Sequence, residues 1–157
     1  MGTPNAVIFD TNIYIYHSWG YPDAIDIVNQ CAKDGMEIIM PSIIISELFS
    51  VPLVDEDQTV KKAMEQYVKI AKTADLDEEV ALKAGEIRRK WRKATGKKLK
   101  TPDSIIAATA IIHDATLYSN NERDFAYLRD NFQLKYFNPI ADQEQLNRFI
   151  EKYTSVA

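Results

Sequence analysis

The sequence of 157 residues has one cysteine, two histidines and no long apolar run, and each scarcity argues against a class of protein. A lone cysteine, Cys31, cannot form a disulfide within the chain, which disfavours a secreted domain held together by disulfides. No segment approaches the roughly 20 apolar residues that a membrane helix needs. We therefore expect no membrane association, a reducing cytoplasmic setting, and a core position for Cys31.

The chain also lacks an excess of basic residues, because 23 acidic and 19 basic side chains give a net charge of -4. This balance disfavours a protein that coats nucleic acid, but it permits an enzyme that meets nucleic acid locally. The N-terminal segment MGTPNAV has neither the charged region nor the longer apolar region of a signal peptide. We expect one domain over residues 1–157, since no repeat or linker divides the chain.

Short β-prone segments alternate with segments of helical spacing. Strands are predicted at 6–9, 37–40, 116–119 and 134–137, and helices at 11–17, from 22 to about 34, at 43–50 (with a strand as the alternative), 57–72, 77–94, 102–113 and 125–130, and from Asp142 onward. Such alternation predicts an α/β fold in which a small parallel sheet of four or five strands lies between two layers of helices.

Two of these helical segments carry further predictions. The helix at 102–113 is apolar on nearly every side, so we expect it to be central and buried. The helices at 57–72 and 77–94 each have one apolar face, and we expect them to form an antiparallel pair, a clamp-like subregion over residues 57–94. Ser42, Thr101 and Asp142 are the expected helix caps.

Four acidic residues stand out by their positions. They are Asp10 directly after the first strand, Glu47 within the apolar segment IIISELF, Asp103 in the first turn of the buried helix, and Asp124 in SNNERDF after the third strand. Each alone has an ordinary explanation as a turn former, a cap or a solvated charge. Strand ends and helix starts meet at one edge of a parallel sheet, however, so we expect the four to share a pocket.

Four carboxylates at one edge would repel one another and raise their pKa values, and a divalent cation would remove that cost. Oxygen ligands without a cysteine or histidine cluster favour Mg²⁺ or Mn²⁺ over zinc. Polar neighbours are available to orient the carboxylates, although they would serve equally well as turn and cap residues. These neighbours are Thr11, Asn12, Ser119, Asn120 and Asn121.

With these residues the sequence resembles the PIN-domain family, close to the VapC-type toxin ribonucleases. The matching pieces, in the family's order, are VIFDTNIYI, PSIIISELF, TPDSIIAATAIIHDATLYSNNERDF and YFNPI. The resemblance implies Mg²⁺- or Mn²⁺-dependent cleavage of RNA to 5′-phosphate and 3′-hydroxyl ends. It assigns Asp10, Glu47 and Asp103 as the three core acids. Many members have a fourth aspartate where this chain has Asn121, and others use the position of Asp124, which we take here.

The resemblance also implies an RNA substrate, a small antitoxin as partner, and a homodimer. The segment 88–100, which holds eight basic residues and no acid, leads directly to Asp103. It is either a phosphate-tracking patch or the solvated face of a helix and loop. In the first case we expect RNA contacts from Arg92, Lys97, Lys98 and Lys100, and Trp91 or nearby tyrosines could stack on bases. In the second case Trp91 lies in the core, which is the position we expect for it.

Two other enzyme classes and one binding class compete with the nuclease. A phosphatase with an aspartyl nucleophile also begins with a strand and an aspartate, but it usually has a second acid where this chain has Asn12. A receiver-type phosphoacceptor would need a paired acid cluster and a lysine at a strand end. The remaining alternative is a PIN scaffold without catalytic activity that binds RNA or a protein.

Overall fold

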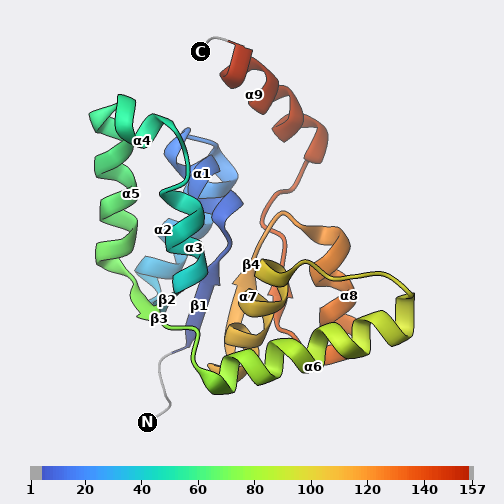
Figure 1. Ribbon diagram of the computed structural model, residues 1–157. Coiled ribbons are helices and arrows are strands. Elements are labelled where there is room, and N and C mark those ends of the chain that lie inside the picture. Colours follow the sequence, from blue (N-terminus) through green and yellow to red (C-terminus); the bar gives the residue numbers. More distant parts are fainter. Residues whose placement is uncertain (1–4, 156–157) are drawn as a thin grey trace.

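A computed structural model describes residues 5–155 and shows a sheet covered by helices (Figure 1). Within that range the strands are β1 (Ala6–Phe9), β2 (Glu37–Pro41), β3 (Lys72–Ala74), β4 (Ala115–Tyr118) and β5 (Tyr136–Phe137). All four strand pairs are parallel, and the order across the sheet is β3-β2-β1-β4-β5. The predicted three-layer α/β/α fold with a small parallel sheet is confirmed. The predictions that concern residues 1–4 and 156–157 lie outside the described residues.

The helices of this range account for most of the remaining chain. They are α1 (Thr11–Ser18), α2 (Pro22–Lys33), α3 (Ser42–Leu48), α4 (Leu53–Glu56), α5 (Gln58–Ile70), α6 (Glu78–Thr95), α7 (Thr101–Ile112), α8 (Glu122–Phe132) and α9 (Gln143–Ser155). Figure 1 shows α7 in front of the sheet and α2 behind it. None of the helices in residues 5–155 is both long enough and apolar enough to cross a bilayer.

The central strand β1 sets the geometry of the edge where the predicted acids meet. Val7, Ile8 and Phe9 are at most 1% exposed, as expected for a strand covered on both faces. β1 pairs in register with β4 from Ala6 opposite Ala115 to Phe9 opposite Tyr118. The residues that follow these two strands therefore emerge side by side.

The helix α7 is the buried centre that the sequence predicts, because every residue from Ser104 to Ala110 is buried. Two buried hydroxyl groups are satisfied within the helix, since Ser104 donates to the carbonyl of Thr101 and Thr109 to that of Ile105. Both bonds remove the cost of an unpaired polar group in the core. α7 packs on β2, β4 and α6, and its first turn places Asp103 at the carboxyl edge of the sheet.

The predicted antiparallel pair of helices over residues 57–94 is wrong. The main contacts of α5 are with α4, α1 and β3, whereas α6 packs lengthwise against α7. Figure 1 shows α5 and α6 on different sides of the molecule. The strand β3 between them includes Lys72, which was expected to be helical. An apolar helix face needs an apolar partner, but nothing requires that partner to be the next helix in sequence. The clamp-like role stays a prediction.

Helix starts differ from the predictions at three places. Neither Ser42 nor Thr101 is a cap, because each is the first residue of its helix and the preceding Pro41 and Lys100 make no side-chain capping bond. α8 begins at Glu122, so the predicted polar turn is shorter than expected. The cap at Asp142 is confirmed by the Gln145 N–H, which donates to its carboxylate at 3.1 Å.

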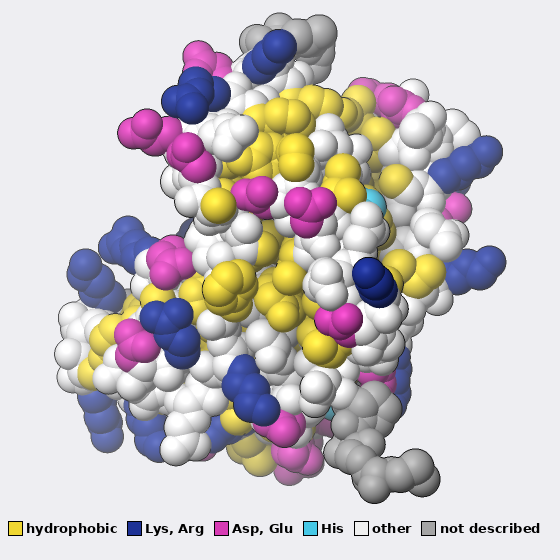
Figure 2. Space-filling view, turned by 180° about the vertical axis from the view of Figure 1, so that it is seen from behind, with side chains coloured by type: hydrophobic (Ala, Val, Ile, Leu, Met, Phe, Trp, Pro, Cys, Tyr) yellow, Lys and Arg dark blue, Asp and Glu magenta, His cyan; other side chains and the backbone are white. Residues whose placement is uncertain are grey.

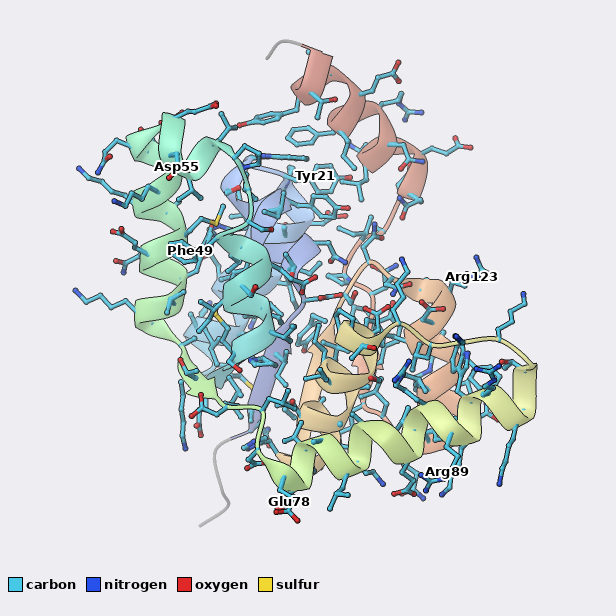
Figure 3. All side chains as sticks on the ribbon, in the orientation of Figure 1. Tyr21, Phe49, Asp55, Glu78, Arg89 and Arg123 are labelled. Carbon is cyan, nitrogen blue, oxygen red and sulfur yellow. The ribbon has the colours of Figure 1, made fainter. Side chains whose placement is uncertain are left out.

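A small second apolar cluster joins the last helix to the region around α1. Leu146 of α9 is fully buried, Tyr21 packs edge-on against Phe149, and Trp19 stacks on Tyr153 with 4.8 Å between ring centroids. Figure 3 shows Tyr21 lying toward α9, and Figure 2 shows hydrophobic side chains gathered at the end of the molecule that carries this helix. The predicted apolar stripe of α9 is confirmed.

Candidate active site

Asp10 directly follows β1 and is the N-cap residue of α1, with only 6% of its surface exposed. One carboxylate oxygen accepts the Thr11 backbone N–H at 2.8 Å, and the other accepts the Ser119 hydroxyl at 2.7 Å and the Asn12 amide at 3.3 Å. Burial raises the pKa of Asp10 in spite of these bonds, and the nearby charge of Glu47 raises it further. The fold thus holds a carboxylate firmly in place without a cationic partner among the described residues.

Glu47 reaches the same edge from α3. Ile44 and Leu48 of this helix are fully buried, so the helix is anchored while the Glu47 side chain stays partly exposed. The Thr11 hydroxyl donates to Glu47 at 2.8 Å. Because Thr11 follows Asp10 directly, this single bond ties the second acid to the first.

Asp103 is the third acid, and the first turn of α7 presents it next to the other two. Burial, and then the charges of Asp10 and Asp124, raise the pKa of Asp103 to about 6 from the usual 3.8, while Lys100 opposes the shift. The Asn121 amide lies 3.5 Å from Asp103 and 3.3 Å from Asp124. Both distances are long for hydrogen bonds, so Asn121 bridges these two acids loosely.

The segment that follows β4 holds the site together from the other side. Ser119 is fully buried, and its hydroxyl accepts the Asn121 backbone N–H at 3.0 Å while donating to Asp10. The backbone N–H of Asn120 donates to the side-chain oxygen of Asn12 at 3.1 Å. Tyr136 of β5 donates its hydroxyl to the Ser119 carbonyl at 2.9 Å. The polar residues picked out in the sequence therefore do contact the acids or one another.

Three of the four predicted acids line one cavity of about 430 Å³. Its walls are formed by Asp10, Thr11, Asn12, Ile15, Tyr16, Glu47, Lys100, Pro102, Asp103 and Asn121. Asp124 is not among them: it lies in the first turn of α8, where the Asn121 amide contacts it and its charge raises the pKa of Asp103. Sequence reasoning missed Ile15 and Tyr16, although their spacing of three and four residues from Asn12 places all three on one helix face.

The donor set of this cavity fits a hard divalent cation by its chemistry. All candidate ligands are carboxylate, hydroxyl or amide oxygens, and burial with mutual repulsion raises the pKa values of Asp10 and Asp103. Within residues 5–155, no three side chains from Asp, Glu, His and Cys converge tightly enough to form a coordination shell by themselves. Mg²⁺ usually keeps several waters and binds through one or two carboxylates, so a closed protein shell is not required.

The predicted RNA-contacting residues separate into two places. Lys100 lines the acidic cavity, whereas Arg92 and Lys98 line a different cavity and Lys97 is exposed. Trp91 is buried against the ring of Tyr127 at 4.7 Å, which confirms the interpretation of Trp91 as a core residue. Cys31 is likewise buried, as predicted.

The PIN domain family profile matches residues 7–131, a range that contains all four predicted acids. The chain belongs to the PIN-domain family. Among curated proteins, this PIN-domain chain is similar to Ribonuclease VapC19 of Mycobacterium tuberculosis, with 28% identity over 123 residues that cover 78% of the chain and 94% of the relative. The family resemblance inferred from the sequence is confirmed.

Solved structures share the fold of this PIN-domain protein. VapBC2 from Rickettsia felis, solved with a DNA fragment from the promoter, aligns with a TM-score of 0.70 and 23% identity over 85% of this chain and 98% of that one. A toxin–antitoxin complex from Klebsiella pneumoniae aligns with a TM-score of 0.65 and 21% identity over 86% and 98%. The helix α9 lies beyond the range that the family profile matches.

Proposed function

We propose that this PIN-domain protein is an endoribonuclease that depends on Mg²⁺ or Mn²⁺, and that it is the toxin of a toxin–antitoxin pair. The observation that carries the proposal is the meeting of Asp10, Glu47 and Asp103, from three separate elements, around one cavity. The similarity to a protein named as a ribonuclease supports RNA as the substrate. The raised pKa values of Asp10 and Asp103 support a bound cation, because a positive charge would offset the burial and the repulsion that disfavour the ionised carboxylates.

Asp10 and Asp103 would hold the cation, with Glu47 beside them. Asp124, which lies behind Asn121, would be a further candidate ligand. When bound, Mg²⁺ or Mn²⁺ supplies the Lewis acidity and positive charge that hydrolysis of a phosphodiester needs. The three hydrogen bonds on Asp10 keep its carboxylate from rotating away, and Thr11 does the same for Glu47. Residues that hydrogen-bond to a metal ligand usually affect metal affinity and activity almost as much as the ligand itself does.

The RNA strand would enter where Lys100 faces the acids. Its ammonium group can neutralise a phosphate that would otherwise be repelled by the carboxylates. Arg92, Lys97 and Lys98 would then contact the strand farther from the cleaved bond. The main alternative, a PIN scaffold that binds RNA without cutting it, keeps the cations but does not need the three acids.

A small antitoxin, encoded by a neighbouring gene, is the proposed protein partner, because the similar structures include toxin–antitoxin complexes. A homodimer and a cytoplasmic location are further parts of this proposal. Copurification with the product of the adjacent gene tests the partner, and light scattering of the purified complex tests the dimer. A protein that copurifies with no neighbour product and stays monomeric would contradict both.

RNA cleavage by the purified protein tests the enzyme. With Mn²⁺ we expect a single-stranded RNA to be cut, with EDTA we expect no cutting, and Asp103→Asn should lower the rate by roughly a hundredfold or more because it removes a charged ligand. Asp55→Asn, an exposed acid of α4, is the matched control and should cut like the wild type. Cutting by Asp103→Asn at the wild-type rate would show that the acids are not catalytic.

A further inference from the structure

The helix α6 carries cations on two faces that differ in their acidic partners. On one face Glu86 lies between Lys83 at 3.7 Å and Lys90 at 2.7 Å, so both lysines are paired. The hydrogen bond from Lys90 and the charge of Lys83 lower the pKa of Glu86, and the charge of Arg89 contributes least. Glu86 thus offsets part of the positive charge on this face.

The other face has no such neutralisation. Arg92 lies four residues after Arg88 and three residues after Arg89, so its side chain is a neighbour of both on the helix surface. No acidic side chain among residues 5–155 forms an ion pair with any of the three. Like charges at this spacing destabilise a helix. An arrangement with this cost and no ion-pair partner among residues 5–155 points to an anion from outside the chain.

The loop after α6 and these arginines together line a cavity. Gly96, with a φ of 75°, ends the helix and its N–H donates to the Arg92 carbonyl at 2.8 Å. The loop then runs back above the helix, on which Figure 3 labels Arg89. Leu99 is buried, and its carbonyl accepts the Arg88 side chain at 3.2 Å, which fixes the loop to the helix.

The resulting cavity of about 210 Å³ is lined by Arg88, Arg89, Arg92, Lys98 and Leu99. Among the described residues, no acid lines it, and no hydroxyl or amide side chain does so. Guanidinium groups bind phosphate oxygens through two parallel hydrogen bonds, which makes arginine the preferred residue for phosphate recognition. Three guanidinium groups and one ammonium group around a small hollow therefore suit a single phosphate of a larger polyanion.

The chain itself connects this basic cavity to the acidic one. Lys98 lines the basic cavity and Lys100 lines the acidic cavity. Two residues of chain span at most about 7 Å, so one extended polyanion can reach both. We propose that the basic cavity of Arg88, Arg89, Arg92 and Lys98 binds a backbone phosphate of single-stranded RNA outside the cleavage site, which makes it a second anchor for the substrate. The identity of the anion rests on the proposed function.

Salt-dependent RNA binding in EDTA, where no cleavage is expected, tests this second anchor. The probe is a fluorescent 20-nucleotide single-stranded RNA of mixed sequence, titrated at several salt concentrations and read by anisotropy. The double variant Arg89→Gln/Arg92→Gln should bind several-fold more weakly, and its log–log salt slope should fall by about 0.7 for each phosphate that the variant no longer neutralises. The matched double variant Lys83→Gln/Lys90→Gln removes the same net charge from the paired face and should bind like the wild type.

Two further measurements keep the result interpretable. Thermal melting should show the arginine variant to be folded, since both side chains are exposed, and Arg92→Lys should keep the salt slope while losing part of the affinity. An arginine variant with unchanged binding, an equal loss in both double variants, or no RNA binding by the wild type would overturn the anchor. So would an arginine variant that binds RNA normally but no longer copurifies with the adjacent gene product, because the cavity would then serve a protein.

This experiment separates the anchor from the proposed nuclease. Binding is measured without divalent ions, so it does not require catalysis. A wild type that binds RNA through the arginines but never cuts it in Mn²⁺ contradicts the nuclease and supports the anchor. If the wild type cuts RNA, and the arginine variant binds and cuts RNA equally well, then only the anchor is contradicted.

Discussion

At the scale of single residues, Ser119 links two parts of the candidate active site through its hydroxyl group. It lies 109 positions after Asp10 in sequence, yet its hydroxyl donates to the Asp10 carboxylate at 2.7 Å from a fully buried position. The same oxygen accepts the Asn121 backbone N–H. Ser119 therefore couples the acid after β1 to the turn after β4, because one hydroxyl group serves both as donor and as acceptor.

Removing this hydroxyl should affect both stability and metal affinity. Ser119→Ala leaves the Asn121 N–H without its partner, so we expect a loss of about 1–3 kcal/mol in the free energy of unfolding, measured by urea denaturation. Because Asp10 also loses an orienting bond, Mn²⁺ affinity measured by calorimetry should fall by roughly 10–100-fold. Ser46→Ala, on the exposed face of α3, is the control and should change neither quantity. Equal Mn²⁺ affinity in Ser119→Ala and the wild type would contradict the orienting role.

At the scale of elements, α6 is held by its apolar stripe. Val80, Ala84, Ile87 and Trp91 are all buried, at intervals of three or four residues along the chain, and the helix packs along α7. The same helix presents Glu86 with its lysines on one flank and the three arginines of the basic cavity on the other. A firm apolar contact thus fixes the position of the charges that we assign to RNA.

Truncation of the largest residue in that stripe tests the contact. Trp91→Ala removes a side chain that is 7% exposed, and we expect the free energy of unfolding to fall by about 3–5 kcal/mol. Leu82→Ala on the same helix removes a side chain that is 68% exposed, and its effect should stay within about 0.5 kcal/mol. Urea denaturation of both variants makes the comparison. Similar losses in the two variants would mean that α6 is not docked through this stripe.

At the scale of the whole molecule, the parallel sheet collects acids that are far apart in sequence. The carboxyl ends of β1, β2 and β4 face the same edge, and α1, α3, α7 and α8 follow or approach them there. Folding therefore brings like charges together, which destabilises the protein when the carboxylates are ionised. The effect is a property of the assembled edge, since no single element contains two of the four acids.

The pH dependence of stability should reveal this cost in the metal-free protein. The pKa of Asp103 is about 6 in the folded protein and near 3.8 when unperturbed. Between these two pH values the folded protein therefore holds a proton on Asp103 that the unfolded chain has lost. Its contribution to stability is therefore greatest below about pH 4 and is lost as the pH rises through about 6. Asp103→Asn, which cannot ionise, should raise the melting temperature in EDTA at pH 7.5 and not at pH 4.

The same melts contain the control for this prediction. Asp55→Asn removes an exposed acid that has no part in the cluster, so its melting temperature should follow the wild type at both pH values. If Asp103→Asn lowered the melting temperature at pH 7.5, or shifted it equally at both values, the ionised Asp103 would not be a net cost to the folded protein. Mn²⁺ should stabilise the wild type at pH 7.5 much more than Asp103→Asn, because binding to the folded state alone adds stability.

Local patterns by themselves determined the order of most strands and helices, the burial of α7 and the identity of Asp10, Glu47 and Asp103 as candidates. These features follow from periodicity and from the position of a polar residue at the end of an apolar run, which neighbours in sequence decide. The motifs also indicated the family, which the comparison confirmed. The chemical class of the proposed cation followed from the scarcity of nitrogen and sulfur ligands.

Only the tertiary structure decided which surfaces meet. A helical pattern tells which face of α5 or α6 is apolar, but the partner that covers it depends on packing over the entire sheet. The bond between Ser119 and Asp10 depends on the register of β1 against β4, and the cavity of Arg88, Arg89, Arg92 and Lys98 depends on how the loop returns over α6. Contacts across such separations are set by the global fold, because local propensity extends over only a few residues.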